Sequence, residues 1–476
     1  MATVAGATTS NNKSSSNNKD AAASSKTGPP VQVFVRLRPL IPEEEGHEVI
    51  EFKTNDRQSQ FQLKQPSQEE APAKINPVFA GAPPLRRRKD QWKSFDGFNK
   101  ILKDDKNNEQ VYQATIQPLV TAVAEQPNLS ACVFTYGHTG SGKSHTLLGY
   151  DDELGVYKFA AAEMLEQLAD NDDNGKMMLL VRVSELYKDT VHDLLTKEQC
   201  SIRQDGKGVV QVRGPMKEDD LGRIDQLPLG KLCSTAPEVV DCVEAAVASR
   251  RVGISTHHSQ SSRSHLVVEL EVVTAELVEQ RNLLMTRDAH LTRLKWLQTE
   301  RSFGKHLDRP MPKWTKPYMD GNAPTKLRKE ILQYETLVKE SKQCVAKLEK
   351  NLGGTLVFCD LAGNEYARDA AGSTKEEMEE AAEINKSLLA VKEMIRSLNN
   401  NAKGKGTNHV PYRDSKLTMM LRRHLDNKAV MMAHLSPSQE SWRKTINTLT
   451  YAALVGQNSK GAVGKRQQGK ENKIRQ

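Results

Sequence analysis

The stretch FTYGHTGSGKSHTLLG, Phe134 to Gly149, constrains the fold of this chain more than any other segment. Its centre, GHTGSGKS, has the GxxxxGK[ST] spacing of a phosphate-binding loop, and it lies between a strand-like run and a helical stretch, as such loops do. Glycines let backbone N–H groups converge on a phosphate, the lysine reaches the β- and γ-phosphates, and the final hydroxyl can ligate Mg²⁺. A glycine-rich turn without a ligand is the alternative, which the strand context disfavours. The predicted nucleotide-binding residues are Gly137, His138, Thr139, Gly140, Ser141, Gly142, Lys143 and Ser144.

Apolar patterning around this loop predicts an α/β fold. Short apolar runs at 31–40, 130–137 and 355–363 are typical of buried strands, and the last two end in glycine. Helical periodicity is present at 238–250, 376–398 and 415–424. One central sheet flanked by helices accounts for both patterns.

Segment 274–352 does not fit a compact core. It holds two helical stretches around a proline-rich turn. The second stretch carries a stripe at alternating spacings of three and four, formed by Ile331, Tyr334, Val338, Ser341, Val345 and Leu348. Two helices folded back on each other as an inserted hairpin are favoured over a dimerising coiled coil, because the stripe is short.

Composition divides the rest of the chain. Residues 1–30 are rich in Ser, Asn, Ala and Thr, with too little apolar surface to offset the entropy of ordering, so we expect a disordered tail. Residues 31–456 are expected to form one domain that contains the hairpin. The segment 457–476 reads as a basic, flexible tail.

Cysteine usage and charge limit the environment and the partners. The six cysteines are scattered without a CxxC pair, and no secretory leader is evident, so we expect the reducing cytosol. No long apolar run predicts a membrane span, and a mean hydropathy of -0.62 is typical of a soluble protein. A net charge of +8 favours an acidic partner, which charge alone does not identify.

Nucleotide hydrolysis needs groups that sense the γ-phosphate, hold the metal and position water. In FCDLAGNE, Asp360 ends an apolar strand and offers a carboxylate to the metal through its water shell, and Gly363 can present a backbone N–H to the γ-phosphate. Glu365 is a candidate partner for Arg263 of SSRSH. The neighbouring hydroxyls of Ser261 and Ser262 suit Mg²⁺ and the attacking water.

With these three pieces the chain resembles the kinesin motor domain from Val31 to about Val455. Further segments agree in order: RLRP (36–39), FDGF (95–98), ELYKDTVHDLL (185–195), INKSLLAV (384–391), VPYRDSKLT (410–418) and NTLTYA (447–452). The resemblance implies a kinesin-like P-loop NTPase with an eight-stranded, mostly parallel sheet, ATP and Mg²⁺ at one edge, and a microtubule-stimulated ATPase. It also implies that Arg36, Pro39 and His145 surround adenine, and that an Arg263–Glu365 pair links two switch segments.

The same resemblance implies tubulin, rather than nucleic acid, as the acidic partner. The expected microtubule contacts are Asn385, Lys386, Tyr412, Arg413, Lys416, Arg422 and Arg423. A charge run that merely solvates one face is the alternative for any single lysine. The acidic cluster Glu376, Glu377, Glu379 and Glu380 would repel tubulin unless it lies away from it.

Subfamily features favour the internal-motor class, the microtubule-depolymerising kinesins. DLAGNE, the run 382–398 and RQDGKGVVQVRG (203–214) are similar to that class, whereas its Lys-Val-Asp loop tip is absent. We hypothesise that the basic cluster 86–89 replaces that tip; a flexible surface loop is the alternative. His258 stands where kinesins usually have Asn, which puts the hydrolysis rate in doubt.

Three outputs therefore stay open: destabilisation of microtubule ends, motility along microtubules, and non-motile binding with weak ATPase activity. The inserted hairpin should emerge from the sheet opposite the nucleotide, because nucleotide binds at the carboxyl end of the strand that ends in Asp360. It is either a protein-partner site or an inert excursion.

Overall fold

A computed structural model describes residues 31–45, 48–55, 57, 59–64, 92–150, 152–171, 175–204, 210–218, 224–250, 263–302, 315, 318, 323–350, 352–364, 374–402, 409–425 and 427–456. Several predicted features lie outside these ranges: the tails 1–30 and 457–476, the cluster 86–89, His258, Ser261, Ser262 and Glu365.

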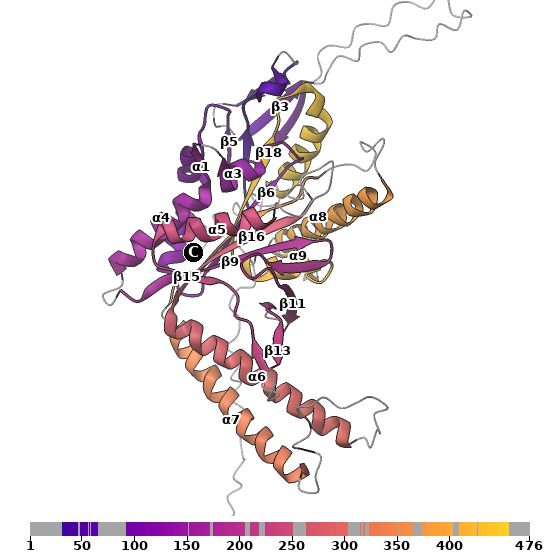
Figure 1. The fold of residues 1–476 in the computed structure, drawn as a ribbon. Helices are drawn as coiled ribbons and strands as arrows, with labels where there is room; N and C mark the ends of the chain where they lie inside the picture. Colours follow the sequence, from indigo (N-terminus) through magenta and orange to yellow (C-terminus); the bar gives the residue numbers. More distant parts are fainter. Residues whose placement is uncertain are drawn as a thin grey trace, which may run out of the picture.

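A large mixed sheet forms the centre of the molecule (Figure 1). Five neighbouring strands run parallel: β5 (Lys100–Leu102), β1 (Gln32–Leu37), β18 (Lys428–Leu435), β6 (Ser130–Tyr136) and β17 (Thr355–Asp360). An antiparallel part continues from β17 through β16 (His265–Thr274), β9 (Met177–Tyr187), β10 (Thr190–Asp193), β11 (Gln199–Gln204) and β12 (Val210–Arg213), and β15 (Lys231–Cys233) pairs with β9.

This topology confirms the three predicted strands and corrects the expected sheet. The sheet has 11 strands among the described residues, and its antiparallel part is as extensive as its parallel part, so the prediction of eight mostly parallel strands was wrong. The physical reason is that β9 and β16 pair along ten residues, and β9 then continues into the short hairpins of β10, β11 and β12.

Smaller sheets flank this one. They are formed by β2 (Phe52–Thr54), β3 (Gln60–Lys64) and β4 (Trp92–Asp96), by β7 (Gly149–Tyr150) and β8 (Glu153–Leu154), and by β13 (Met216–Glu218) and β14 (Ile224–Gln226).

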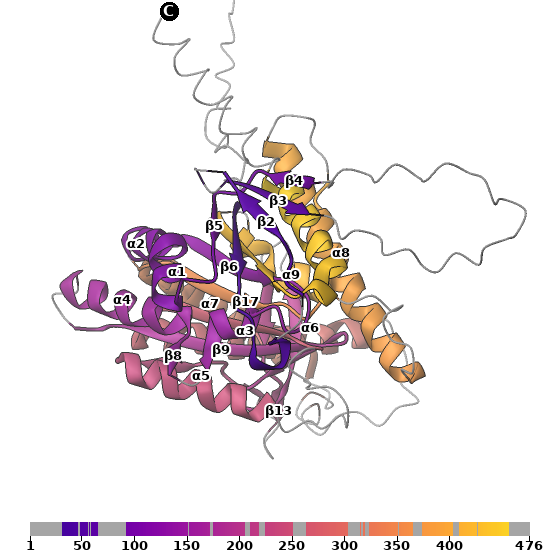
Figure 2. The same cartoon turned by 90° about the horizontal axis from the view of Figure 1, so that it is seen from above.

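Helices cover both faces of the sheet, and each face has its own apolar core. One face packs against α1 (Asn108–Thr115), α2 (Gln117–Glu125), α4 (Val156–Asn171) and α5 (Ala236–Arg250). The other packs against α8 (Lys375–Ala402), α9 (Lys416–Leu425) and a final helix at 442–456. Figure 2 shows the two groups on opposite sides. The helices predicted at 238–250, 376–398 and 415–424 are thus confirmed as α5, α8 and α9.

Two long helices, α6 (Ala275–Ser302) and α7 (Ala323–Glu349), fold back on each other and extend away from the sheet (Figure 1). The predicted stripe on α7 faces α6, since Ile331 and Val338 share a buried cluster with Leu294 and Leu297. The hairpin leaves the end of β16 and returns to the start of β17, where Glu271 pairs with Thr355, whereas Asp360 lies at the opposite end of β17. This arrangement confirms the inserted hairpin and its position opposite the phosphate loop.

No helix within the described ranges is both long and apolar enough to cross a membrane.

Candidate functional site

The phosphate loop, residues 137–144, connects β6 to the short helix α3 (Lys143–Leu148). Gly140 and Gly142 have left-handed backbone angles, with φ of +78° and +95°, which residues with a Cβ adopt only under strain. A Cβ on Gly137 would lie 2.6 Å from the carbonyl oxygen of His434 on β18. These glycines are therefore required by the turn itself and by its close approach to the sheet.

Lys143 is buried in this loop, and its side chain turns back on it. The Nζ ammonium donates to the carbonyl oxygens of Gly137 and His138, each at 3.0 Å. The Ser141 hydroxyl also donates to the carbonyl oxygen of His138, at 2.7 Å. The lysine charge is thus held at the centre of the loop by acceptors that phosphate oxygens can replace.

The carboxylate of Asp360 lies beside this lysine-bearing loop. Its Oδ2 accepts a hydrogen bond of 2.6 Å from the Ser144 hydroxyl, and its Oδ1 accepts one of 3.0 Å from the Thr135 hydroxyl. The atoms that meet here among the described residues are hard oxygens, as Mg²⁺ prefers, and one carboxylate plus substrate phosphates is its usual ligand set in nucleotide sites. The residues present therefore fit the metal predicted at Ser144 and Asp360.

His138 adds an unsatisfied group to the loop. Its side chain is buried, and its Nδ1 has no hydrogen-bond partner among the residues that the structure describes. Burial, followed by the nearby Lys143 charge, lowers the pKa of His138 to about 3. The ring is therefore neutral at pH 7, and a ligand or water can supply the missing partner.

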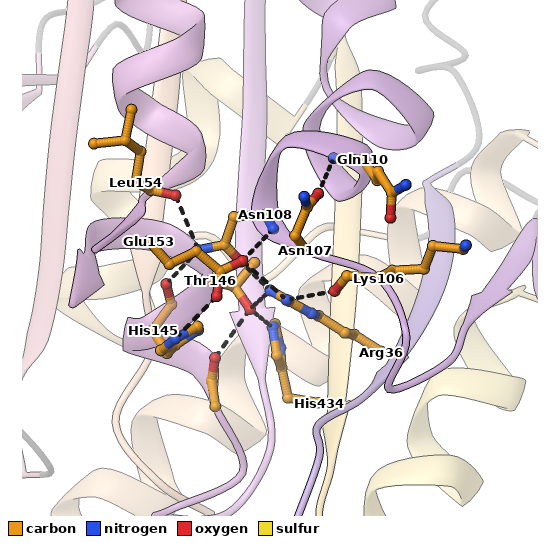
Figure 3. A network of polar contacts seen from close by, with 11 residues as sticks. Arg36, Lys106, Asn107, Asn108, Gln110, His145, Thr146, Glu153, Leu154 and His434 are labelled. Atoms are coloured by element: carbon orange, nitrogen blue, oxygen red, sulfur yellow. Dashed lines mark hydrogen bonds and ion pairs between the residues drawn. The ribbon is translucent and has the colours of Figure 1, made fainter. Parts of the chain in front are cut away.

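The predicted adenine contacts differ in their exposure. Arg36 is buried, and its guanidinium donates to the side chains of Asn108 and Thr146 and to the Lys106 carbonyl (Figure 3). Burial lowers the pKa of Arg36 to about 10, against the opposing effect of Glu153. Arg36 therefore joins β1 to the segments around α1 and α3 instead of lying on an open surface.

Pro39 and His145 are more accessible than Arg36. Pro39 is exposed, and the His145 side chain is 41% exposed, with its Nε2 3.3 Å from an oxygen of Glu153. Glu153 also accepts from the backbone N–H of Asn108, and the Thr146 hydroxyl lies 2.8 Å from Nε2 of His434 (Figure 3). Sequence reasoning missed these partners because they come from separate segments.

Arg38, the second arginine of RLRP, was also missed. Its Nε donates to the carbonyl oxygen of Gly140 at 2.7 Å, and its two terminal nitrogens bind Glu44 at 2.7 and 2.6 Å. The Arg38 hydrogen bond is the main cause that lowers the pKa of Glu44. Arg38 thus contacts the phosphate loop from its outer side. The second arginine of RLRP was the sequence feature from which this contact could have been suspected.

The described parts of the segments predicted to sense the γ-phosphate lie at the end of β17 that carries Asp360. Gly363 is buried in the loop after β17, and the next residue, Asn364, donates its N–H to the Gly137 carbonyl at 3.4 Å. Arg263 precedes β16, and its guanidinium forms an ion pair with Glu380 of α8. Because Glu365 lies outside the described residues, the Arg263–Glu365 pair stays a prediction.

Glu380 is shared between two elements. Besides Arg263, its carboxylate accepts from the Tyr187 hydroxyl at the end of β9. Burial and this hydrogen bond raise the pKa of Tyr187 to about 12. One member of the acidic cluster is therefore removed from solvent and neutralised, which reduces its expected repulsion of an acidic partner.

The predicted tubulin contacts gather on α8, α9 and the turn between them. Asn385 and Lys386 lie on α8, Tyr412 and Arg413 lie in the turn before α9, and Lys416, Arg422 and Arg423 lie on α9. The two helices pack against each other on one side of the sheet (Figures 1 and 2). The Arg422 guanidinium lies 4.6 Å from the centre of the Tyr412 ring, which holds both side chains in place.

A glycine-rich phosphate loop after a central parallel strand, with an aspartate at the end of the neighbouring strand, defines a P-loop NTPase fold. The sequence-family model for the kinesin motor domain matches residues 36–294 and 332–457, and the chain belongs to this family. The intervening unmatched residues, 295–331, cover the distal part of the hairpin.

Curated relatives agree with this assignment. The chain is 30% identical over 89% of its length to the human kinesin-like protein KIF7, of which it spans 25%. It is 28% identical over 78% of its length to KIN-13B of Arabidopsis thaliana, spanning 41%, and 26% identical over 76% to human KIF24, spanning 20%. The chain thus covers between a fifth and two fifths of these relatives.

Solved structures support the fold. A KIF14 dimer bound to AMP-PNP and a microtubule has a TM-score of 0.57 and 21% identity, with 90% of this chain and 94% of that chain covered. A structure of a fast kinesin has the same TM-score at 20% identity, with coverages of 90% and 91%.

Proposed function

We propose that this chain is an ATP-hydrolysing microtubule motor whose turnover is stimulated by microtubules. The observation that carries the proposal is the convergence of Lys143, Ser144 and Asp360 from a phosphate loop and a neighbouring strand. Lys143 would bind the β- and γ-phosphates, with the glycines of the loop admitting them. Bound Mg²⁺, held by Ser144 and Ser262 and by Asp360 through water, would neutralise phosphate charge.

We propose the remaining catalytic roles from the sequence motifs, since Ser261, Ser262 and Glu365 lie outside the described residues. The Gly363 N–H would bind the γ-phosphate, and Ser261, Ser262 and Glu365 would orient the attacking water, with Arg263 as their charged partner. Pro39 and His145 offer exposed surface to adenine, while buried Arg36 keeps that region in place. These roles require positioning and charge stabilisation only, as is general for phosphoryl transfer.

The surface formed by α8, α9 and the turn before α9 would bind tubulin. It carries Lys386, Arg413, Lys416, Arg422 and Arg423, and the neighbouring Glu380 is neutralised by Arg263. A cytoplasmic location on the microtubule cytoskeleton follows from this partner.

For the output we propose destabilisation of microtubule ends. The DLAGNE and RQDGKGVVQVRG segments and the similarity to KIN-13B and KIF24 favour it. Motility along microtubules is the second candidate, favoured by the ordinary YRDSK form of the 412–416 turn. Non-motile binding with weak ATPase activity is the third, favoured by His258.

One experiment separates the three. ATP turnover is measured with stabilised, fluorescent microtubules while their length and position are imaged. Shortening from the ends with accelerated turnover supports end destabilisation, and gliding over a protein-coated surface supports motility. Binding along the microtubules without faster ATP turnover supports the non-motile binding protein. No binding to microtubules at all refutes the proposal.

We also propose that the hairpin binds a protein partner. A groove of about 440 Å³ on α6 and α7 is lined by apolar and polar side chains, namely Leu291, Val338, Ala346, Gln343, Glu335, Lys339 and Lys342. Glu335 is paired with Lys295 at 2.7 Å, which leaves Lys339 and Lys342 as the charges that face an incoming partner. This pattern suits an amphipathic helix with acidic flanks. A labelled Leu/Glu amphipathic peptide should bind the wild type and lose affinity when both lysines are changed to Glu; equal affinity would refute the groove.

A further inference from the structure

One buried histidine connects the loop after β17 to helix α8. His265 begins β16 and is only 3% exposed. Its Nδ1 lies 3.0 Å from the backbone nitrogen of Ala362, the residue before Gly363. Its Nε2 lies 2.8 Å from the hydroxyl oxygen of Ser387 on α8. Both ring nitrogens therefore form hydrogen bonds, and each bonds to a different segment of the chain.

The chemistry of these contacts allows only one arrangement of protons. A backbone N–H can only donate, so Nδ1 must present its lone pair to Ala362. Burial, with the charges of Arg250 and Lys143, lowers the pKa of His265 to about 3, so the ring carries a single proton at neutral pH. That proton is on Nε2 and is donated to Ser387, whose hydroxyl donates in turn to the Ile384 carbonyl at 2.7 Å.

The residue before His265 fixes this strand end to the rest of the domain. Ser264 is fully buried, and its hydroxyl donates to Glu185 of β9 at 2.5 Å and accepts from Arg250 of α5 at 3.0 Å. Arg250 also reaches Glu185, at 3.2 Å. Ser264 therefore anchors the backbone while the side chain of its neighbour is directed to α8.

Arg263 and His265 contact the same face of α8. Arg263 pairs with Glu380 and His265 with Ser387, and these two positions are seven apart, or two helical turns. His265 also binds the loop that carries Gly363, so it connects α8 to that loop.

We propose that His265 is a positioning residue that couples the loop after β17 to α8 through its two ring nitrogens. The proposal deepens the proposed function, since that loop would sense the γ-phosphate and α8 would face tubulin. A displacement of the Ala362 N–H towards a phosphate must move the ring or break its hydrogen bond. A moved ring takes the Nε2–H with it, and Ser387 conveys the change to α8.

Hydrogen exchange of α8 amides in the full chain tests this without tubulin. Exchange is compared between Mg-ADP and Mg-AMP-PNP for the wild type, for Ser387→Ala and for His265→Asn, whose amide oxygen can replace Nδ1 but does not reach Ser387. Ser397→Ala is the matched control, because Ser397 lies on α8 without a side-chain hydrogen bond to any described residue.

We expect α8 exchange in the wild type and in Ser397→Ala to depend on the nucleotide. In Ser387→Ala the ratio of the two rates should fall about five-fold, the effect of one buried hydrogen bond of about 1 kcal/mol. The ratio should fall by the same factor in His265→Asn, and combining the two substitutions should lower it no further. Ser387→Ala with the wild-type ratio, or a wild type with no nucleotide dependence, would overturn the proposal.

Failure of the proposed function has a different signature. If microtubules do not accelerate ATP turnover but α8 exchange still depends on nucleotide and on Ser387, the coupling stands and the motor assignment falls. If microtubules accelerate wild-type and Ser387→Ala turnover equally and the exchange ratio is also unchanged, the motor assignment stands and the coupling falls.

Discussion

Replacing Glu271 by glutamine tests how the hairpin is joined to the sheet. Glu271 lies on β16 at the hairpin root and is 5% exposed. Its carboxylate binds Arg182 of β9 and Arg281 of α6, each at 2.8 Å. Arg281 also binds Glu349 of α7 at 2.7 Å, so this carboxylate belongs to a network that ties both hairpin helices to the sheet.

The magnitude follows from the pKa of this carboxyl group. Burial alone would raise it, but the guanidinium groups of Arg182 and Arg281 outweigh burial and lower the pKa of Glu271 from 4.5 to about 2. A lowering of this size corresponds to about 3 kcal/mol of unfolding free energy at neutral pH. The loss of unfolding free energy in Glu271→Gln stays near that value, because each arginine retains another carboxylate partner. Arg182 still pairs with Glu269, and Arg281 still pairs with Glu349.

Urea unfolding of the wild type and of Glu271→Gln measures the difference. Because the folded pKa is depressed, the stabilisation is complete above pH 4.5 and is lost as the pH falls towards about 2, so the difference between the two proteins should shrink over that range. The exposed Glu276 of α6 gives a matched control, and Glu276→Gln should change little. ATP turnover should be unaffected. A difference below about 1 kcal/mol at pH 7, or one that grows at low pH, would refute the reasoning.

Three further predictions concern the candidate site. Lys143→Ala should weaken Mg-ATP binding at least about 100-fold in calorimetry, because the phosphate charge loses its central ammonium. Ser144→Ala should raise the Mg²⁺ concentration for half-maximal ATP turnover about tenfold, since one oxygen ligand is removed. Arg38→Ala should lower the free energy of unfolding by about 2 kcal/mol in urea titrations, because the charged bonds to Glu44 and Gly140 are lost.

Each of these three predictions would be contradicted by a specific result. Unchanged calorimetric affinity in Lys143→Ala would remove the phosphate loop from the mechanism. An unchanged Mg²⁺ requirement in Ser144→Ala would place the metal elsewhere. Wild-type stability of Arg38→Ala would mean that its contacts to the phosphate loop are replaced by water at no cost.

Local motifs made the geometry of the candidate phosphate loop predictable from the sequence. The glycine spacing before Lys143 encodes its own turn, and the apolar run before Asp360 places that carboxylate at the end of a strand. Parallel pairing of β17 with β6 then brings Asp360 level with Thr135, close to Ser144. Two local patterns and one general rule of sheet geometry were sufficient.

Other features depend on partners that the sequence does not pair. Arg36 was assigned to adenine from its motif, but its burial depends on Asn108 and Thr146, which belong to other elements. His265 and Glu380 carried no distinguishing signal, because a histidine in SSRSH and a glutamate in an acidic run have many ordinary roles. The antiparallel strands after β9 are short, with weak alternation, and were not recognised.

Microtubule affinity in two nucleotide states tests the central claim most directly, namely that nucleotide held at Lys143 alters the surface of α8 and α9. Cosedimentation with stabilised microtubules is carried out in Mg-AMP-PNP and in Mg-ADP, for the wild type and for Lys143→Ala. We predict tighter binding of the wild type in Mg-AMP-PNP, by about tenfold, and no difference for the variant. Equal wild-type affinity in both nucleotides would contradict the account.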